Sequence, residues 1–161
     1  MSINRHIGAL GVLILFLVGS RAPYAQGPAP SPLATVKSLT CVFPIYATGT
    51  WTKEEPQAAV KPAKLSLRFD SIDTQDGTAD LIGGFPGGIA PSHIIARLSE
   101  RSLHLLAIDT SAALYVTTVF DKDRRGGKLK AVHTRHEYTE VSLPGYTSRP
   151  EQYYGECEVS Q

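Results

Sequence analysis

Apolar and polar residues alternate along most of the chain after residue 35, with the period of two that is typical of β-strands. The clearest example is Leu65, Leu67 and Phe69, which alternate with polar side chains. Successive side chains of a strand point to opposite faces, so this pattern predicts strands with one buried and one exposed face. In all, it predicts eight strands, at 39–43, 65–70, 79–81, 94–98, 103–108, 114–121, 128–138 and 153–159.

Turn signals separate these strands, at 76–77, 83–91, 100–101, 109–111, 124–127 and 143–150. Short strands joined by short links predict an all-β fold, a single antiparallel meander closed or nearly closed into a barrel. A β-sandwich is the alternative. Residues 54–62 are expected to form a loop.

The N-terminal segment differs from the rest of the chain. Arg5 and His6 precede an uncharged apolar run at 7–18, and small residues follow it. This layout predicts a secretory signal peptide over 1–25, cleaved after Ala22 or Ala25. The run is shorter than the roughly 20 residues of a spanning helix, so we expect no transmembrane segment after cleavage. The prediction places the protein in the periplasm or outside the cell, with a Pro-rich linker at 26–35 and one domain at 36–161.

Charge and composition exclude two classes of protein. The chain has 16 basic and 15 acidic side chains, and the predicted cleavage removes only Arg5 and Arg21 from this balance. A near-neutral domain gives no electrostatic reason to bind nucleic acid. Apolar residues make up 42% of the chain, which is too many for a disordered protein.

Cys41 and Cys157 are the two cysteines of the sequence. In an exported protein such a pair predicts one disulfide. Because bridged Cα atoms lie within about 7 Å, the bridge requires the first and last strands to be neighbours or to face each other. Both cysteines fall on the apolar side of their strands, which predicts a buried bridge.

Four segments of the chain resemble a family of small exported bacterial proteins: Cys41-Val42-Phe43, Gly49-Thr50-Trp51, the run 131–136 (AVHTRH) and the run 152–157 (QYYGEC). The resemblance implies export and a β-rich fold and brings no activity with it. The Gly49-x-Trp51 pattern is also similar to the GxW signature of lipocalins, which are eight-stranded ligand-binding barrels. Trp51 is therefore a candidate ligand-binding residue.

The densest polar cluster lies on the seventh predicted strand. Here His133, Arg135 and Glu137 share one face, the face of Leu129 and Ala131. If the alternation persists, His133 and Arg135 point into the barrel near the end of the strand, where they need partners such as Glu137, another carboxylate, water or a ligand. One hypothesis is that the cluster is an anion-receptive ligand site with Arg135 as the donor. The alternatives are a hydrogen-bonded cluster that closes one end of the barrel, or a register change that exposes both side chains.

Metal and cofactor motifs are missing from the sequence. It has no CxxC and no HExxH, and His133 and His136 fall on opposite faces of a strand. We therefore expect neither a metal nor a cofactor. A hydrolase that uses His133 is one functional hypothesis, although no G-x-S-x-G elbow is present.

Two other hypotheses are non-enzymatic. The first is a binding module of the bacterial envelope for a small apolar or amphipathic ligand, held in or at the mouth of the barrel. The second is a structural or protein-interaction module with a filled core and no ligand.

Overall fold

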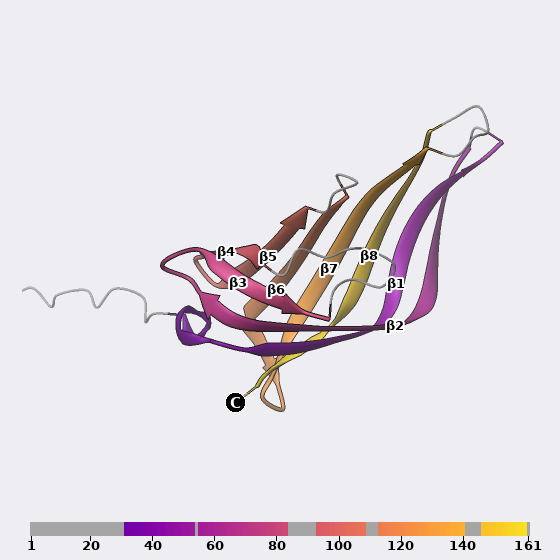
Figure 1. Ribbon diagram of the computed structural model, residues 1–161. Coiled ribbons are helices and arrows are strands. Elements are labelled where there is room, and N and C mark those ends of the chain that lie inside the picture. The colour runs from indigo at the N-terminus through magenta and orange to yellow at the C-terminus, as the bar shows by residue number, and fades with distance from the viewer. Residues whose placement is uncertain (1–30, 54, 84–92, 109–112, 141–145, 161) are drawn as a thin grey trace, which may run out of the picture.

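The computed structural model of the protein describes residues 31–53, 55–83, 93–108, 113–140 and 146–160. In this part of the chain a short 3-10 helix, η1 (Pro32–Thr35), precedes eight strands (Figure 1). The strands are β1 (Leu39–Thr52), β2 (Glu55–Asp73), β3 (Thr78–Ile82), β4 (His93–Ser99), β5 (Ser102–Ile108), β6 (Leu114–Arg125), β7 (Lys128–Glu140) and β8 (Tyr146–Val159). No helix among the described residues is long and apolar enough to cross a membrane.

Hydrogen bonding between the strands runs around a closed ring. Each strand is antiparallel to the next along the chain, and β8 returns to pair with β1. The all-β meander predicted from the sequence is therefore confirmed. Cys41 and Cys157 face each other across β1 and β8, and their sulfur atoms lie 1.97 Å apart, at disulfide distance. Both side chains are fully buried.

Alternate side chains of the strands fill the interior of the ring. On β1, Cys41 and Phe43 are buried while Val42 between them is 55% exposed. Burial of apolar surface stabilises by roughly 25 cal/mol per Å², so these inward side chains are the main source of stability. The largest fully buried apolar side chains are Phe43, Phe69, Leu33, Leu39, Leu67, Ile72, Leu103 and Leu105.

Leu33 reaches this core from η1, before the first strand. The hydroxyl of Ser31 accepts a hydrogen bond from the backbone N–H of Leu33 and donates one to Asp121 on β6. Residues 31–35 fall in the segment predicted as a linker, yet Leu33 is fully buried. The packed part of the chain therefore begins before residue 36, because one apolar side chain of this segment covers the end of the core.

The ring is uneven, because its strands differ greatly in length. The strands β3, β4 and β5 have 5, 7 and 7 residues, whereas β2 has 19. The β1–β2 and β7–β8 hairpins therefore project beyond the short strands, as Figure 1 shows. Among the described residues, β2 pairs with β3 only from Arg68 onward, and β1 pairs with β8 only as far as Thr48. We call the end of the ring that holds the buried Cys41–Cys157 pair the closed end, and the end from which the two hairpins project the mouth.

A bulge bends β1 where it leaves the closed end. Its register shifts between Phe43 and Ile45 against β2 and between Val42 and Ile45 against β8, and Pro44 lies within both shifts. A bulge tolerates proline because no ladder hydrogen bond is needed there. On β8, a Cβ atom at Gly155 would lie 2.8 Å from the Cα of Phe43 and would collide with the carbonyl oxygen of Val42. Glycine at this position therefore lets β8 approach the bulge.

Two sequence predictions are wrong at the mouth. The expected loop at 54–62 is strand from Glu55 onward, paired with the second half of β1. It escaped detection because residues 55–62 are exposed on both faces, so burial imposes no alternation there. The turn predicted over 143–150 is also strand from Tyr146 onward, since these residues continue the ladder with β7; residues 143–145 lie outside the described part.

Candidate functional site

Two cross-strand rows of inward-pointing side chains form the bottom of the mouth. The deeper row runs Thr117, His133, Tyr153, Tyr46 across β6, β7, β8 and β1. His133 is 2% exposed, and its Nδ1 lies 2.9 Å from the hydroxyl oxygen of Thr117. The rings of Tyr46 and Tyr153 stack with centroids 5.2 Å apart, and the ring of Tyr153 lies 5.7 Å from that of His133. Side chains directly opposite in a sheet contact one another, so the register itself assembles this row.

The outer row contains the charged groups of the mouth. It runs Tyr115, Arg135, Glu151 across β6, β7 and β8. The guanidinium carbon of Arg135 lies 5.8 Å from the centre of the Tyr115 ring, within reach of a cation–π interaction. Nη1 of Arg135 lies 3.9 Å from Oε2 of Glu151, and the Tyr153 hydroxyl donates a 2.7 Å hydrogen bond to the same oxygen.

Burial sets the protonation states of this cluster. Desolvation, with repulsion from Arg135 as a smaller cause, lowers the pKa of His133 to about 4. The imidazole is therefore neutral at pH 7. Burial and the hydrogen bond to Glu151 raise the pKa of Tyr153, so its phenol remains a donor. Neither His133 nor Tyr153 therefore adds a charge to the two rows.

These rows form the floor of a pocket of about 270 Å³. The side chains of Arg135 and Glu151 are 23% and 20% exposed, so solvent reaches them through the mouth. The lining residues are Tyr46, Ala63, Lys64, Leu65, Tyr115, His133, Arg135, Glu151 and Tyr153. Aromatic rings on several sides and a guanidinium group make a surface for a flat apolar body that carries an anionic group.

The structure brings together two of the four residues proposed from the sequence. His133 and Arg135 point inward from β7, at the end of the core. The side chains of Trp51 and Glu137 lie outside the described part of the structure. The backbone of Trp51 pairs with Pro56, and that of Glu137 pairs with Arg149.

Sequence reasoning missed five residues of the cluster: Tyr46, Tyr115, Thr117, Glu151 and Tyr153. Tyr46 follows the bulge at Pro44, which changes the alternation of β1. On β6, Tyr115 and Thr117 alternate with residues that are just as apolar, so the pattern does not identify the inward set. Glu151 falls in a segment predicted to be a turn. The sequence indicates that Arg135 needs a partner, but it does not indicate where in the chain that partner lies.

The other described histidines, at positions 93, 104 and 136, do not line the mouth pocket. His133 is buried and His136 exposed, as expected for residues on opposite faces of β7. His93 pairs with Asp80 at 2.6 Å, and His104 contacts Thr118 at 3.0 Å. Within the described ranges, no three His, Cys, Asp or Glu side chains lie where they could hold one metal ion.

Comparisons with known proteins add nothing to this geometry. No model of a protein family matches the sequence, no curated protein is similar to it, and no solved structure matches the fold.

Proposed function

We propose that this protein is a non-enzymatic binding module of the bacterial envelope, which holds a small amphipathic ligand at the mouth of its β-ring. The observation that carries the proposal is the position of Arg135, partly exposed inside a pocket with aromatic walls. A positively charged group beside aromatic rings is a surface that can receive the anionic end of an amphipathic ligand.

The chemistry of the pocket favours an amphipathic anion. The guanidinium group of Arg135 is planar and carries five N–H donors, a shape that matches the oxygen atoms of a carboxylate, sulfonate or phosphate. His133 is neutral at pH 7 and adds no charge, while the half-buried rings of Tyr46 and Tyr153 line the pocket and offer aromatic surface to the apolar part of the ligand.

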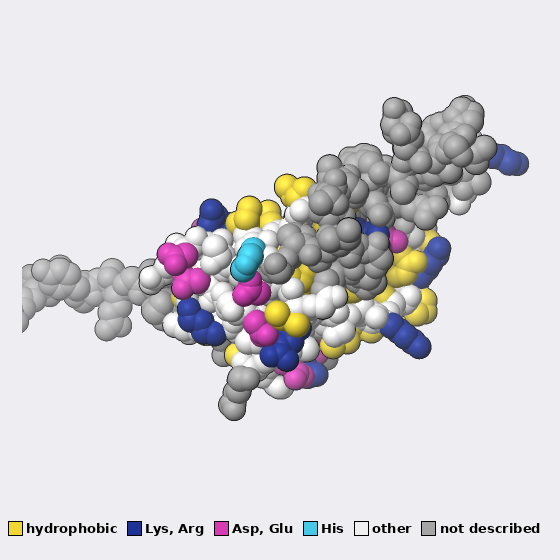
Figure 2. Space-filling model, viewed as in Figure 1, with side chains coloured by type: hydrophobic (Ala, Val, Ile, Leu, Met, Phe, Trp, Pro, Cys, Tyr) yellow, Lys and Arg dark blue, Asp and Glu magenta, His cyan; other side chains and the backbone are white. Residues whose placement is uncertain are grey.

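Size and charge narrow the class of ligand further. Ligand pockets usually measure about 300–1,000 Å³, so a pocket of about 270 Å³ suits a small ligand of up to three rings. Acidic and basic side chains are interspersed on the face shown in Figure 2, with no continuous basic surface. This mixture supports a small ligand in preference to nucleic acid.

A matched pair of dyes tests the proposal. Anilinonaphthalene sulfonate and phenylnaphthylamine share an apolar body, but only the first has an anionic group. We expect the sulfonate to bind more tightly to the wild-type protein, with fluorescence enhancement. Arg135→Gln should weaken the sulfonate about tenfold, since a charge-assisted hydrogen bond contributes roughly 1.5–3 kcal/mol, and should leave phenylnaphthylamine unchanged. Equal losses for both dyes, or no binding of either, would contradict the proposal.

A structural module with a filled core is the second candidate. It is favoured by the interior below His133, where Phe43, Leu67 and Phe69 pack without exposure. Native mass spectrometry of protein purified from its own envelope separates the two candidates. A bound small molecule supports the binding module, whereas an unliganded protein that binds neither dye supports the structural module.

Export is part of the same proposal. A buried disulfide-distance pair is what an oxidising compartment would produce and maintain. Cell fractionation with mass spectrometry should find a mature protein that begins after Ala22 or Ala25 and has no alkylatable thiol. A cytoplasmic protein that retains residues 1–25 and reacts with alkylating reagents would contradict export.

A further inference from the structure

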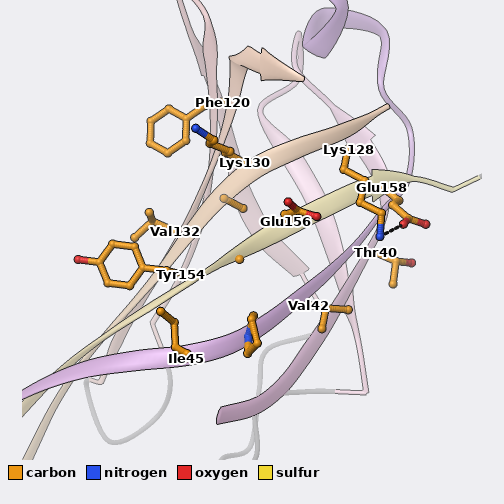
Figure 3. Close-up of a pocket in the computed structure, with 13 residues that line it drawn as sticks. Thr40, Val42, Ile45, Phe120, Lys128, Lys130, Val132, Tyr154, Glu156 and Glu158 are labelled. Atoms are coloured by element: carbon orange, nitrogen blue, oxygen red, sulfur yellow. Dashed lines mark ion pairs between the residues drawn. The ribbon is translucent and has the colours of Figure 1, made fainter. Parts of the chain in front are cut away.

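A second groove lies on the outer face of β1, β7 and β8, on the side of the sheet opposite the mouth pocket. It measures about 900 Å³ and is drawn in Figure 3. Its lining side chains alternate along the strands with the buried ones. For example, Glu156 lies between Gly155 and the buried Cys157, and Val42 lies between the buried Cys41 and Phe43. The groove is therefore separate from the site of the proposed function.

The strand register arranges the groove as three cross-strand rows. The first row is Lys128, Glu158, Thr40, the second is Lys130, Glu156, Val42, and the third is Val132, Tyr154, Ile45. Polarity therefore changes along the groove, from charged in the first row to apolar in the third. Figure 3 shows Val132, Tyr154 and Ile45 together at one end and Lys128 and Glu158 at the other. At 3.3 Å per residue, the distance from Lys128 to Val132 is about 13 Å.

The apolar part of the groove is open to solvent. Val42, Ile45, Phe120 and Tyr154 are 55%, 43%, 37% and 41% exposed. These four make up a large share of the exposed large apolar side chains in the described part of the chain. Single exposed apolar residues are ordinary, but a contiguous exposed group beside charged residues is typical of a binding surface.

The charged end of the groove carries both signs in equal number. Lys130 on β7 lies opposite Glu156 on β8, and the side chain of Lys128 on β7 pairs with that of Glu158 on β8. Lys128 and Glu158 are 2.6 Å apart. A ligand with a single net charge would meet attraction and repulsion together here. A headgroup with one cationic and one anionic group complements both strands.

We propose that the outer groove binds one molecule of a single-chain zwitterionic amphiphile, of the chemical class that joins a phosphate and an ammonium group to one alkyl chain. The phosphate lies toward Lys128 and Lys130, and the ammonium group lies toward Glu156 and Glu158. The chain extends over Val132, Tyr154 and Ile45. The charge pattern selects the headgroup, and the exposed apolar row binds the chain.

Three amphiphiles with the same decyl chain test this assignment: decylphosphocholine, decyl sulfate and decyltrimethylammonium. Each is titrated into the full-length mature protein below the concentration at which it forms micelles, and binding is followed by amide chemical shifts in two-dimensional NMR. Affinities are taken from the amides of the outer rows alone, because decyl sulfate is also an amphipathic anion of the kind proposed for the mouth. At the outer groove, we expect decylphosphocholine to bind at least fivefold more tightly than the other two. Its shifts should be confined to the outer rows of β1, β7 and β8.

Exposed charges allow the selectivity to be changed without altering the core. Glu156→Gln leaves an excess of lysine and should move the preference toward decyl sulfate, whereas Lys130→Gln should move it toward decyltrimethylammonium. Tyr154→Ser should weaken all three probes. Arg135→Gln at the mouth is the matched control and should leave decylphosphocholine binding unchanged.

Several results would overturn the proposal. They are equal affinities of the three headgroups at the outer groove, decylphosphocholine shifts centred on the mouth residues, and no binding of decylphosphocholine below the micelle concentration. Binding only to phospholipid vesicles would also overturn it, because it would indicate a membrane surface as the partner. Because the two sites are distinguished by different variants, failure here leaves the mouth proposal standing.

Discussion

The closed end and the projecting β1–β2 hairpin use the same two strands in opposite ways. At the closed end, every second residue of β1 and β2 is buried, including Cys41, Phe43 and Phe69. Beyond the bulge at Pro44, residues 55–62 of β2 are exposed on both faces. The closed end is therefore held by a core as well as by the backbone ladder, whereas the hairpin is held mainly by its ladder.

This difference separates stability from recognition. Regions with few buried contacts open locally at low free-energy cost, and binding sites are commonly drawn from such regions. The mouth pocket lies at the boundary, where His133 still belongs to the core and Arg135 already reaches solvent. Pro56 and Pro62 remove backbone donors from the exposed hairpin, which limits pairing with other chains.

The largest expected effect comes from the bridge that ties the two ends of the closed region. Cys41 and Cys157 are separated by 116 positions. In the chain-entropy model, closure of such a loop stabilises by about 4–5 kcal/mol. Replacing both residues by Ala should lower the free energy of unfolding by this order, as measured with urea. An effect below about 1 kcal/mol would show that the closed end does not depend on the bridge.

Removing a core side chain should cost nearly as much as removing the bridge. Phe43 is fully buried and contacts the backbone region of Gly155, so Phe43→Ala should destabilise by about 3–5 kcal/mol. The matched control lies on the hairpin, where Val60 is 70% exposed; Val60→Ala should stay within about 0.5 kcal/mol. Similar losses at both sites would remove the distinction between the two regions.

The boundary residue His133 should make the free energy of unfolding depend on pH. The pKa of His133 is about 4 in the folded protein, whereas the ordinary pKa of a histidine is 6.5. The unfolded chain therefore binds the proton more tightly, and the free energy of unfolding should fall as the pH drops from 6.5 to 4. The expected loss is on the order of 3 kcal/mol.

His133→Gln should remove this part of the pH profile, as followed by urea unfolding at several pH values. Hydrogen bonds from Ser38 and Arg68 lower the pKa of Asp70, so the stability that it contributes is lost only at lower pH. Direct NMR titration of the His133 ring gives a readout that does not depend on whether the variant folds. A folded-state pKa near 6.5 would contradict the burial described here.

The sequence predicted those regions in which burial imposes a pattern. The alternation of Leu65, Leu67 and Phe69 appears because one face of β2 meets the core. The sequence pattern did not predict the part of the same strand at 55–62, because neither face is buried there and burial does not select apolar residues. At the site, the inward direction of His133 and Arg135 followed from the parity of Leu129 and Ala131 on the same strand.

The partners of those two residues could not be predicted in the same way. Thr117 and Glu151 face His133 and Arg135 because of the register between strands, which depends on hairpin lengths and on the bulge at Pro44. A single-strand pattern carries no information about register. The outer groove was missed for the same reason, since its rows combine residues from three strands.

Native-state hydrogen exchange, with and without anilinonaphthalene sulfonate, tests the central contrast most directly. Without the dye, we expect amides of β3–β5 and of residues 39–43 to exchange only through global unfolding, and the paired amides of residues 46–60 to exchange by local opening. The dye should slow exchange around Tyr46, Tyr115, His133 and Arg135 and leave the closed end unchanged. Two results would contradict the account: equally slow amide exchange along all of β1 and β2, or slowing of exchange by the dye that is centred on the closed end.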